Sequence, residues 1–188
     1  MRYTKGHKEQ TRKNILETAG KKFRKDGVAA VGLADLMADA GLTNGAFYAH
    51  FKSKEDLLKN VINCVFEERE ADIASLTSAA GLAGALSAYL SPQHRDNSGL
   101  GCPTAALVAE IARHPKATRK VFTEKLESSL RQLATLIPAE NEADSYRKAI
   151  AVFSLIVGAV QLARAVTDKS LSDQILQSAL DAALMLSQ

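Results

Sequence analysis

The chain of 188 residues contains little of several residue types that mark particular protein classes. It has no tryptophan, four prolines and two cysteines, and aromatic residues make up 5% of it. Because proline breaks helices, its scarcity beside frequent Ala, Leu, Lys and Glu favours a helical protein. Cys64 and Cys102 lie 38 positions apart without the CxxC spacing of metal or redox motifs. We therefore expect reduced thiols and a cytoplasmic location.

Signals for export, membrane insertion and catalysis are also missing. Residues 1–10 are polar and basic with no apolar run behind them, which argues against a signal peptide. The longest apolar stretch, residues 149–163, contains polar interruptions and is shorter than the ~20 residues of a membrane span. The four histidines are scattered, and no HExxH or GxSxG motif occurs. We predict no membrane partner, no catalytic residue, no metal site and no cofactor, and hence no enzyme.

What the sequence does contain is an uneven charge. Residues 1–60 carry twelve Lys or Arg against seven Asp or Glu, whereas residues 61–188 carry twelve against fourteen. An excess of positive charge at one end suggests binding to a polyanion, and a solvated helix face explains it equally well. Charge alone leaves both interpretations open.

Hydrophobic periodicity predicts an all-α protein of about nine helices, and no β pattern is present. Four helices lie in the basic amino-terminal part and five in a larger, slightly acidic part. We predict a basic amino-terminal domain over residues 1–52 and a larger helical domain over residues 53–188. Residues 76–90 are predicted to be a separate helix, and residues 91–101 are predicted to be a loop.

The segment GLTNGAFYAHFKSKEDL, residues 41–57, has the features of a helix-turn-helix. Gly41 suits the reversal of the chain, and Thr43 is a good N-cap for a third helix running to about Phe51. Ser53 begins a fourth helix in a pattern close to a capping box. Phe47 and Phe51 would anchor the third helix, while Asn44, Tyr48 and His50 could face outward.

Residues 11–61, and especially GLTNGAFYAHFKSKEDL, strongly resemble the amino-terminal domain of the TetR family of transcriptional regulators. The resemblance implies an all-α homodimer that binds a palindromic operator in double-stranded DNA, usually as a repressor, and releases it on sensing a small molecule. Residues matching Tyr48 and Lys54 commonly contact phosphates in the family. Asn44 is the one residue at the base-facing start of the helix whose side chain can read a base edge. The full set of expected DNA-binding residues is Thr43, Asn44, Gly45, Ala46, Tyr48, His50, Lys52 and Lys54, with Arg2, Tyr3 and Lys5 of the amino-terminal arm.

Some of these expectations have alternatives. His50 lies near a helix end and could cap carbonyl groups instead of contacting DNA. Many family members have Ser or Thr where this chain has Gly32, so a phosphate contact is lost there or made by the backbone. The basic arm could supply a replacement, or could be disordered without DNA.

The carboxy-terminal part is predicted to sense a signal and to form the dimer. In the family the last two helices make a four-helix dimer interface, which suits the apolar residues 149–165 with their small Gly158 and Ala159. Cys102 precedes Pro103 at a predicted helix start, where the dipole favours a thiolate. A similar opening occurs in family members that respond to quinones and other electrophiles, so Cys102 is a candidate sensor; a small side chain packed under a loop is the alternative.

A ligand pocket is expected from five apolar residues, for each of which ordinary core packing is an equal explanation: Leu86, Leu107, Ile111, Phe122 and Leu126. The rival to a DNA-binding regulator is a ligand-binding helical protein or small enzyme without DNA function. The identity of the effector stays open at this stage.

Overall fold

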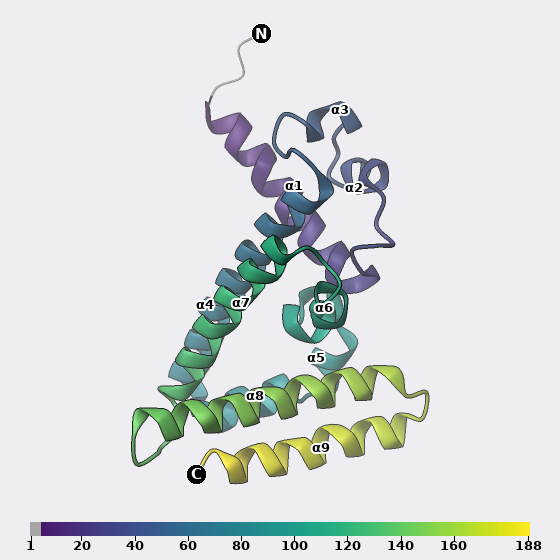
Figure 1. Ribbon diagram of the computed structural model, residues 1–188. Coiled ribbons are helices and arrows are strands. Elements are labelled where there is room, and N and C mark those ends of the chain that lie inside the picture. The colour runs from purple at the N-terminus through teal and green to yellow at the C-terminus, as the bar shows by residue number, and fades with distance from the viewer. Residues whose placement is uncertain (1–4) are drawn as a thin grey trace.

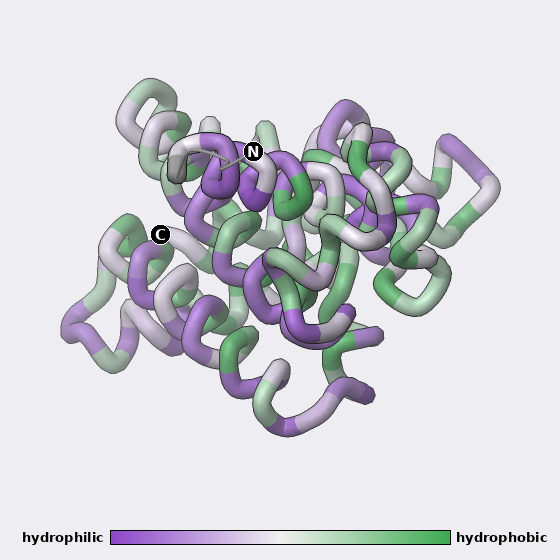
Figure 2. The backbone as a smooth tube through the Cα atoms, turned by 90° about the horizontal axis from the view of Figure 1, so that it is seen from above, coloured by the Kyte–Doolittle hydropathy of each residue, from purple (hydrophilic) through white to green (hydrophobic). Residues whose placement is uncertain are grey.

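The computed structural model describes residues 5–188, and side chains from Gly6 onward. Over this range the chain forms nine α-helices and one 3-10 helix without a strand, which confirms the all-α prediction. Hydrophilic and hydrophobic residues alternate along the helices, as expected of amphipathic elements (Figure 2). The elements are α1 (Lys5–Asp26), α2 (Leu33–Asp39), α3 (Asn44–Phe47), α4 (Lys54–Tyr89), α5 (Pro92–Asp96), η1 (Ser98–Leu100), α6 (Pro103–Ile111), α7 (Lys116–Ala134), α8 (Glu142–Ala165) and α9 (Lys169–Leu186).

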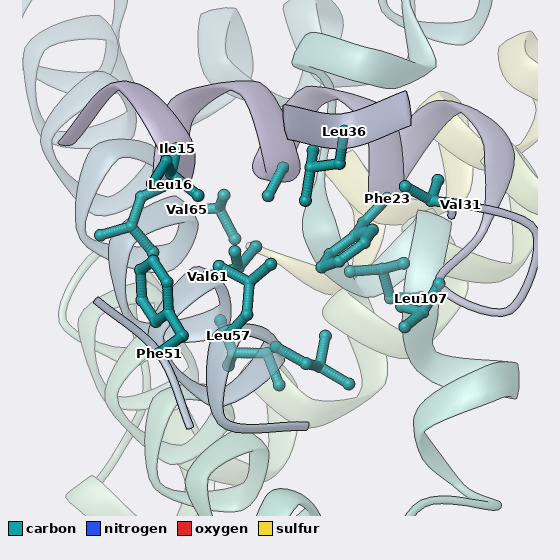
Figure 3. Close-up of a cluster of buried hydrophobic side chains, with 14 of the residues drawn as sticks. Ile15, Leu16, Phe23, Val31, Leu36, Phe51, Leu57, Val61, Val65 and Leu107 are labelled. Atoms are coloured by element: carbon teal, nitrogen blue, oxygen red, sulfur yellow. The ribbon is translucent and has the colours of Figure 1, made fainter. Parts of the chain in front are cut away.

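Helices α1 to α3 form one end of the molecule, and the antiparallel pair α8 and α9 forms the other (Figure 1). Helix α4 starts beside α1 and runs toward the second end with α7 packed along it. The first hydrophobic core joins α1, α2, α3 and the start of α4 through Ile15, Phe23, Leu36 and Phe51 among others (Figure 3). Leu107 of α6 belongs to the same core, so packing couples the amino-terminal helices to the rest of the chain.

Helix α4 is longer than expected, because residues 76–90 continue it instead of forming a separate helix. The helix is interrupted at Gly81, whose φ of 68° and ψ of −178° lie in a region that only glycine adopts easily. The prediction that a separate helix begins at residue 76 was therefore wrong, because the helix breaks only at Gly81, five residues later.

The prediction of a loop over residues 91–101 was also wrong. Ser91 caps α5 by accepting a hydrogen bond from the His94 N–H, and Pro92 occupies the first helical position, where its missing N–H costs nothing. The buried Arg95 then ties α5 to α9 through Asp173 Oδ1 at 2.6 Å and Ser172 Oγ at 2.9 Å. A capped start and this tertiary ion pair stabilise two short helices that propensity alone would not support.

The second hydrophobic core lies between the end of α4, α6 and the α8–α9 pair, with Leu86, Val152, Val160 and Leu176 among its members. Asn141 and Asp168 cap α8 and α9 by accepting hydrogen bonds from the first-turn N–H groups. Within the described residues, α8 is the one helix long and apolar enough to cross a membrane. Buried core helices of soluble proteins have the same length and composition.

Candidate nucleic-acid interface and internal cavity

The reversal between α2 and α3 is made by Gly41, whose φ of 71° is left-handed. The Leu42 N–H then donates to the Met37 carbonyl at 2.8 Å, which closes the end of α2. Thr43 occupies the N-cap position of α3 as predicted, although its side chain accepts no capping hydrogen bond. Helix α3 ends at Phe47, not near Phe51, and residues 48–50 form a turn. The two helices and their turn make a helix-turn-helix.

The aromatic residues of this segment divide between two faces, as the sequence predicts. Phe47 and Phe51 are buried in the first core with ring centroids 5.7 Å apart. Tyr48 meets Phe47 edge-on at 5.2 Å and keeps 67% of its surface exposed. Packing against Phe47 therefore fixes the ring of Tyr48, while the exposed side of the residue can contact an external partner.

The start of α3 presents a small, open surface. Thr43, Asn44 and Gly45 are exposed, and a Cβ atom added at Gly45 would meet nothing within 4 Å. Ala46 is half-buried and packs against the first core, so it offers less surface to a partner than its neighbours do.

His50 lies half-buried between this surface and α1. Its Nδ1 atom is buried and has no hydrogen-bond partner in the described part of the chain. Burial lowers the pKa of His50, and the positive charges of Lys8 and Arg12 lower it further. Arg12 itself is held by stacking over the Phe51 ring at 5.0 Å and by donating to Asn60 Oδ1 at 2.6 Å.

The start of α4 is fixed by reciprocal capping. Ser53 Oγ accepts from the Asp56 N–H and Asp56 Oδ2 accepts from the Lys52 N–H, both at 3.0 Å. This confirms the predicted cap. Lys52 is exposed, and Lys54 is the first residue of the helix and half-buried. Of the arm residues, Arg2 and Tyr3 lie outside the described residues, and only the backbone of Lys5 lies within them, at the start of α1.

A second site candidate is a cavity of about 70 Å³ inside the carboxy-terminal part. Of the five residues predicted to line a pocket, only Leu86 does so. Leu107, Ile111 and Phe122 are buried in the first core, and Leu126 packs against that core. The apolar periodicity that suggested them marks buried helix faces, and cannot tell which of two cores a face enters.

Cys102 also lines this cavity and is 4% exposed at the N-cap of α6. Its N–H donates to His94 Nε2 at 2.9 Å, while His94 Nδ1 lies 2.5 Å from the Tyr89 carbonyl oxygen. The His94 ring is thus neutral, with Nδ1 as donor and Nε2 as acceptor. Burial lowers the pKa of His94 to about 4, and the charges of Arg69 and Arg164 act in the same direction.

Sequence reasoning missed Arg69, Tyr89 and Thr104, which are three of the polar residues that line this cavity. Arg69 stands in the charged run EEREAD, which is typical of a solvated surface. Tyr89 and Thr104 occur at unremarkable positions in helical segments. Only the packing of α4 against α6 and α7 brings these residues together.

An exposed helix-turn-helix at the basic end of an all-helical chain is the arrangement typical of DNA-binding regulators that have a second helical region. The comparisons agree, because residues 15–61 match the family described as bacterial regulatory proteins, tetR family. The helix-turn-helix region of this chain is therefore similar to that of TetR-family regulatory proteins.

The similarity to curated relatives is confined to the amino-terminal part. The HTH-type transcriptional regulator TtgR of Pseudomonas putida is 39% identical over 70 residues, which cover 37% of this chain and 33% of the relative. The HTH-type transcriptional regulator AcrR of Shigella flexneri is 37% identical over 75 residues, covering 40% and 33%. The matched region thus spans about a third of the length of each of these regulators.

Solved structures match over nearly the whole chain. A TetR-family regulator from Cytophaga hutchinsonii superposes with a TM-score of 0.78 at 22% identity, covering 100% of this chain and 98% of that one. Reduced NemR of E. coli gives a TM-score of 0.75 at 20% identity, covering 93% and 95%. At these identities the likeness shows the fold.

Proposed function

We propose that the protein is a transcriptional repressor that binds a palindromic DNA operator as a homodimer and releases it on sensing a small molecule. The single observation that carries this proposal is the exposed surface of Asn44, Gly45 and Tyr48 on a short helix anchored by buried Phe47 and Phe51. Such a surface fits the major groove, with Asn44 available for a base edge. Tyr48 and Lys54 supply phosphate contacts at either side of it.

Dimerisation through α8 and α9 is part of the proposal. An open groove on this pair is lined by small residues such as Gly158 and Ala159 and by the exposed Leu162 and Leu171. Small residues allow close helix approach, and a palindromic operator needs two recognition helices about 34 Å apart. The domain division at residues 52 and 53 and a cytoplasmic location belong to the same proposal.

Release would follow if the effector favours a dimer geometry in which the two recognition helices no longer match adjacent major grooves. An electrophile acting on Cys102 is one candidate signal, supported by the position of this residue in the cavity wall. Treating the DNA complex with a quinone and comparing Cys102→Ser tests it. Equal DNA release by the parent and the variant would exclude Cys102 as the sensor and would favour reversible ligand binding as the signal.

The main test is a mobility shift with DNA from the region upstream of the protein's own gene, at several salt concentrations. Tyr48→Phe and Lys54→Ala should each weaken binding without a matching loss of folding stability, and Lys54→Ala should also reduce the salt dependence because it removes a positive charge. Lys120→Ala, an exposed lysine of α7, is the matched control and should bind as the parent does. Unchanged DNA affinity in both test variants would contradict the proposed DNA-binding function. Failure of the parent to shift DNA, with turnover of a co-purified ligand, would favour a helical enzyme.

A further inference from the structure

The cavity between α4, α6, α7 and α8 has apolar walls and a single charged lining residue. Leu82, Leu86, Phe153 and Ile156 contribute to its apolar surface, and Arg69 is the one charged side chain among the residues that line it. No carboxylate lines the cavity, and Arg69 makes no ion pair within the described residues. Arg69 is half-buried, so solvent reaches part of it, and the part inside the cavity has no anionic partner there.

Three polar atoms around this space lack partners. The hydroxyl oxygens of Tyr89 and Thr104 are buried with no oxygen or nitrogen partner, and these residues are 6% and 4% exposed; the Cys102 thiol, a weak hydrogen-bonding group, lies beside the Tyr89 hydroxyl. The Nε atom of Arg69 is likewise buried and unpaired, and its guanidinium lies 5.8 Å from the centre of the Tyr89 ring. Buried polar groups have partners in most proteins, so three unpaired ones on one cavity mark a place where a polar ligand or water can bind.

The protonation states of the groups around the cavity leave it with hydrogen-bond donors and a positive charge. Burial raises the pKa of Tyr89 well above its usual value, with the nearby Cys102 thiol adding to the effect, so its hydroxyl stays protonated. His94 is neutral because burial lowers its pKa to about 4, and both of its ring nitrogens are already used. The guanidinium of Arg69 is thus the formal charge that lines the cavity, and the two hydroxyl groups can donate beside it.

The size of the space limits what could fill it. About 70 Å³ is roughly half of the ~150 Å³ of an engineered protein cavity that holds benzene. The cavity as it stands therefore suits only a small ligand of a few non-hydrogen atoms.

We propose that this cavity binds a short-chain aliphatic carboxylate of about three or four carbons as the effector. The carboxylate meets Arg69, Tyr89 and Thr104 through charge-assisted hydrogen bonds, and the alkyl chain contacts Leu82, Leu86 and Phe153. The role as effector rests on the proposed function, whereas the binding site itself does not.

The test is isothermal titration of the full-length protein with butanoate and with butanamide, its neutral counterpart of similar shape, at constant ionic strength. Butanoate should bind at least tenfold more tightly than butanamide, and Arg69→Gln should abolish the difference. Arg69→Lys, which keeps the charge, should retain part of it. Tyr89→Phe and Thr104→Val should each weaken butanoate binding severalfold, and Arg113→Gln, on an exposed arginine, should leave it unchanged.

Equal affinity for the two probes, or undiminished butanoate binding by Arg69→Gln, would overturn the site. Absence of butanoate binding by the folded parent protein would do the same and would assign the unpaired atoms to water. Operator binding is measured separately with and without butanoate. Arg69-dependent binding of butanoate by a protein that fails to bind its operator would support the site and contradict only the proposed function. Binding without release of the operator would overturn the role as effector.

Discussion

The carboxylate of Glu110 on α6 accepts a hydrogen bond from the backbone N–H of Val28, just after α1, at 2.8 Å. Its second oxygen accepts from the Ala29 N–H at 2.6 Å. The residues joined are about 80 positions apart, and Thr104 near the other end of α6 lines the cavity. Helix α6 therefore connects the cavity wall directly to the backbone that leads into the helix-turn-helix.

Replacing Glu110 by alanine should lower the free energy of unfolding by about 1–2 kcal/mol, because two backbone donors lose their acceptor. Glu110→Gln keeps one carbonyl oxygen and should lose less. Urea denaturation provides the measurement. Glu124→Ala, which removes an exposed carboxylate of α7, is the control and should change stability by less than about 0.5 kcal/mol. Similar losses for Glu110→Ala and Glu124→Ala would show that the two hydrogen bonds contribute nothing.

Gly45→Ala should separate folding from DNA binding. The added methyl group meets no atom within 4 Å, and alanine is favoured over glycine in a helix by about 1 kcal/mol, so thermal stability should hold or rise. On the proposed DNA-binding surface the same methyl group occupies space that close approach of a base pair requires. Operator affinity should fall at least fivefold in a fluorescence anisotropy titration. A variant that binds DNA as well as the parent would exclude close contact at residue 45.

Leu162→Glu should prevent self-association without unfolding the chain. Leu162 is 59% exposed on the α8–α9 groove, so a carboxylate there costs little in the monomer but would be buried in a dimer. Sedimentation velocity should show a monomer, with helical content unchanged. The control is Leu100→Glu, since Leu100 is 66% exposed on η1 and away from the groove. Dimers of the Leu162 variant, or monomers of both variants, would contradict the proposed interface.

His94 should make stability depend on pH. In the unfolded chain its pKa is near 6.5, whereas in the folded chain burial lowers the pKa to about 4. Between these values the unfolded state binds the additional proton, so stability is greatest above pH 6.5 and falls as the pH drops toward 4. The contribution has an upper limit of about 1.4 kcal/mol per pH unit and should be smaller, because the ring keeps some contact with solvent.

His94→Gln removes the titrating group while keeping an acceptor for the Cys102 N–H. The difference in unfolding free energy between the parent and this variant should therefore shrink as the pH falls from 6.5 to 4. The measurement is urea denaturation at half-unit pH intervals. Parallel curves for the two proteins would show that the ring does not titrate differently on folding.

Local features were predictable from the sequence because they depend on residues within one helical turn of one another. The apolar spacing of α1, the cap at Ser53 and the Cys102–Pro103 start of α6 all depend on neighbours along the chain. The two faces of the recognition segment followed from the same helical periodicity. The break at Gly81 did not, because an isolated glycine is compatible with a continuous helix until packing selects a positive φ.

The sequence by itself determined the all-helical class, the helix-turn-helix and the separation of Phe47 and Phe51 from Tyr48. The tertiary structure alone decided which core receives each apolar face, and it placed Leu107, Ile111 and Phe122 with the amino-terminal helices. It also joined Arg69, Tyr89 and Thr104 around one cavity and Glu110 to Val28. The physical reason is that periodicity shows which side of a helix is buried, whereas contacts between distant segments depend on how the helices pack together.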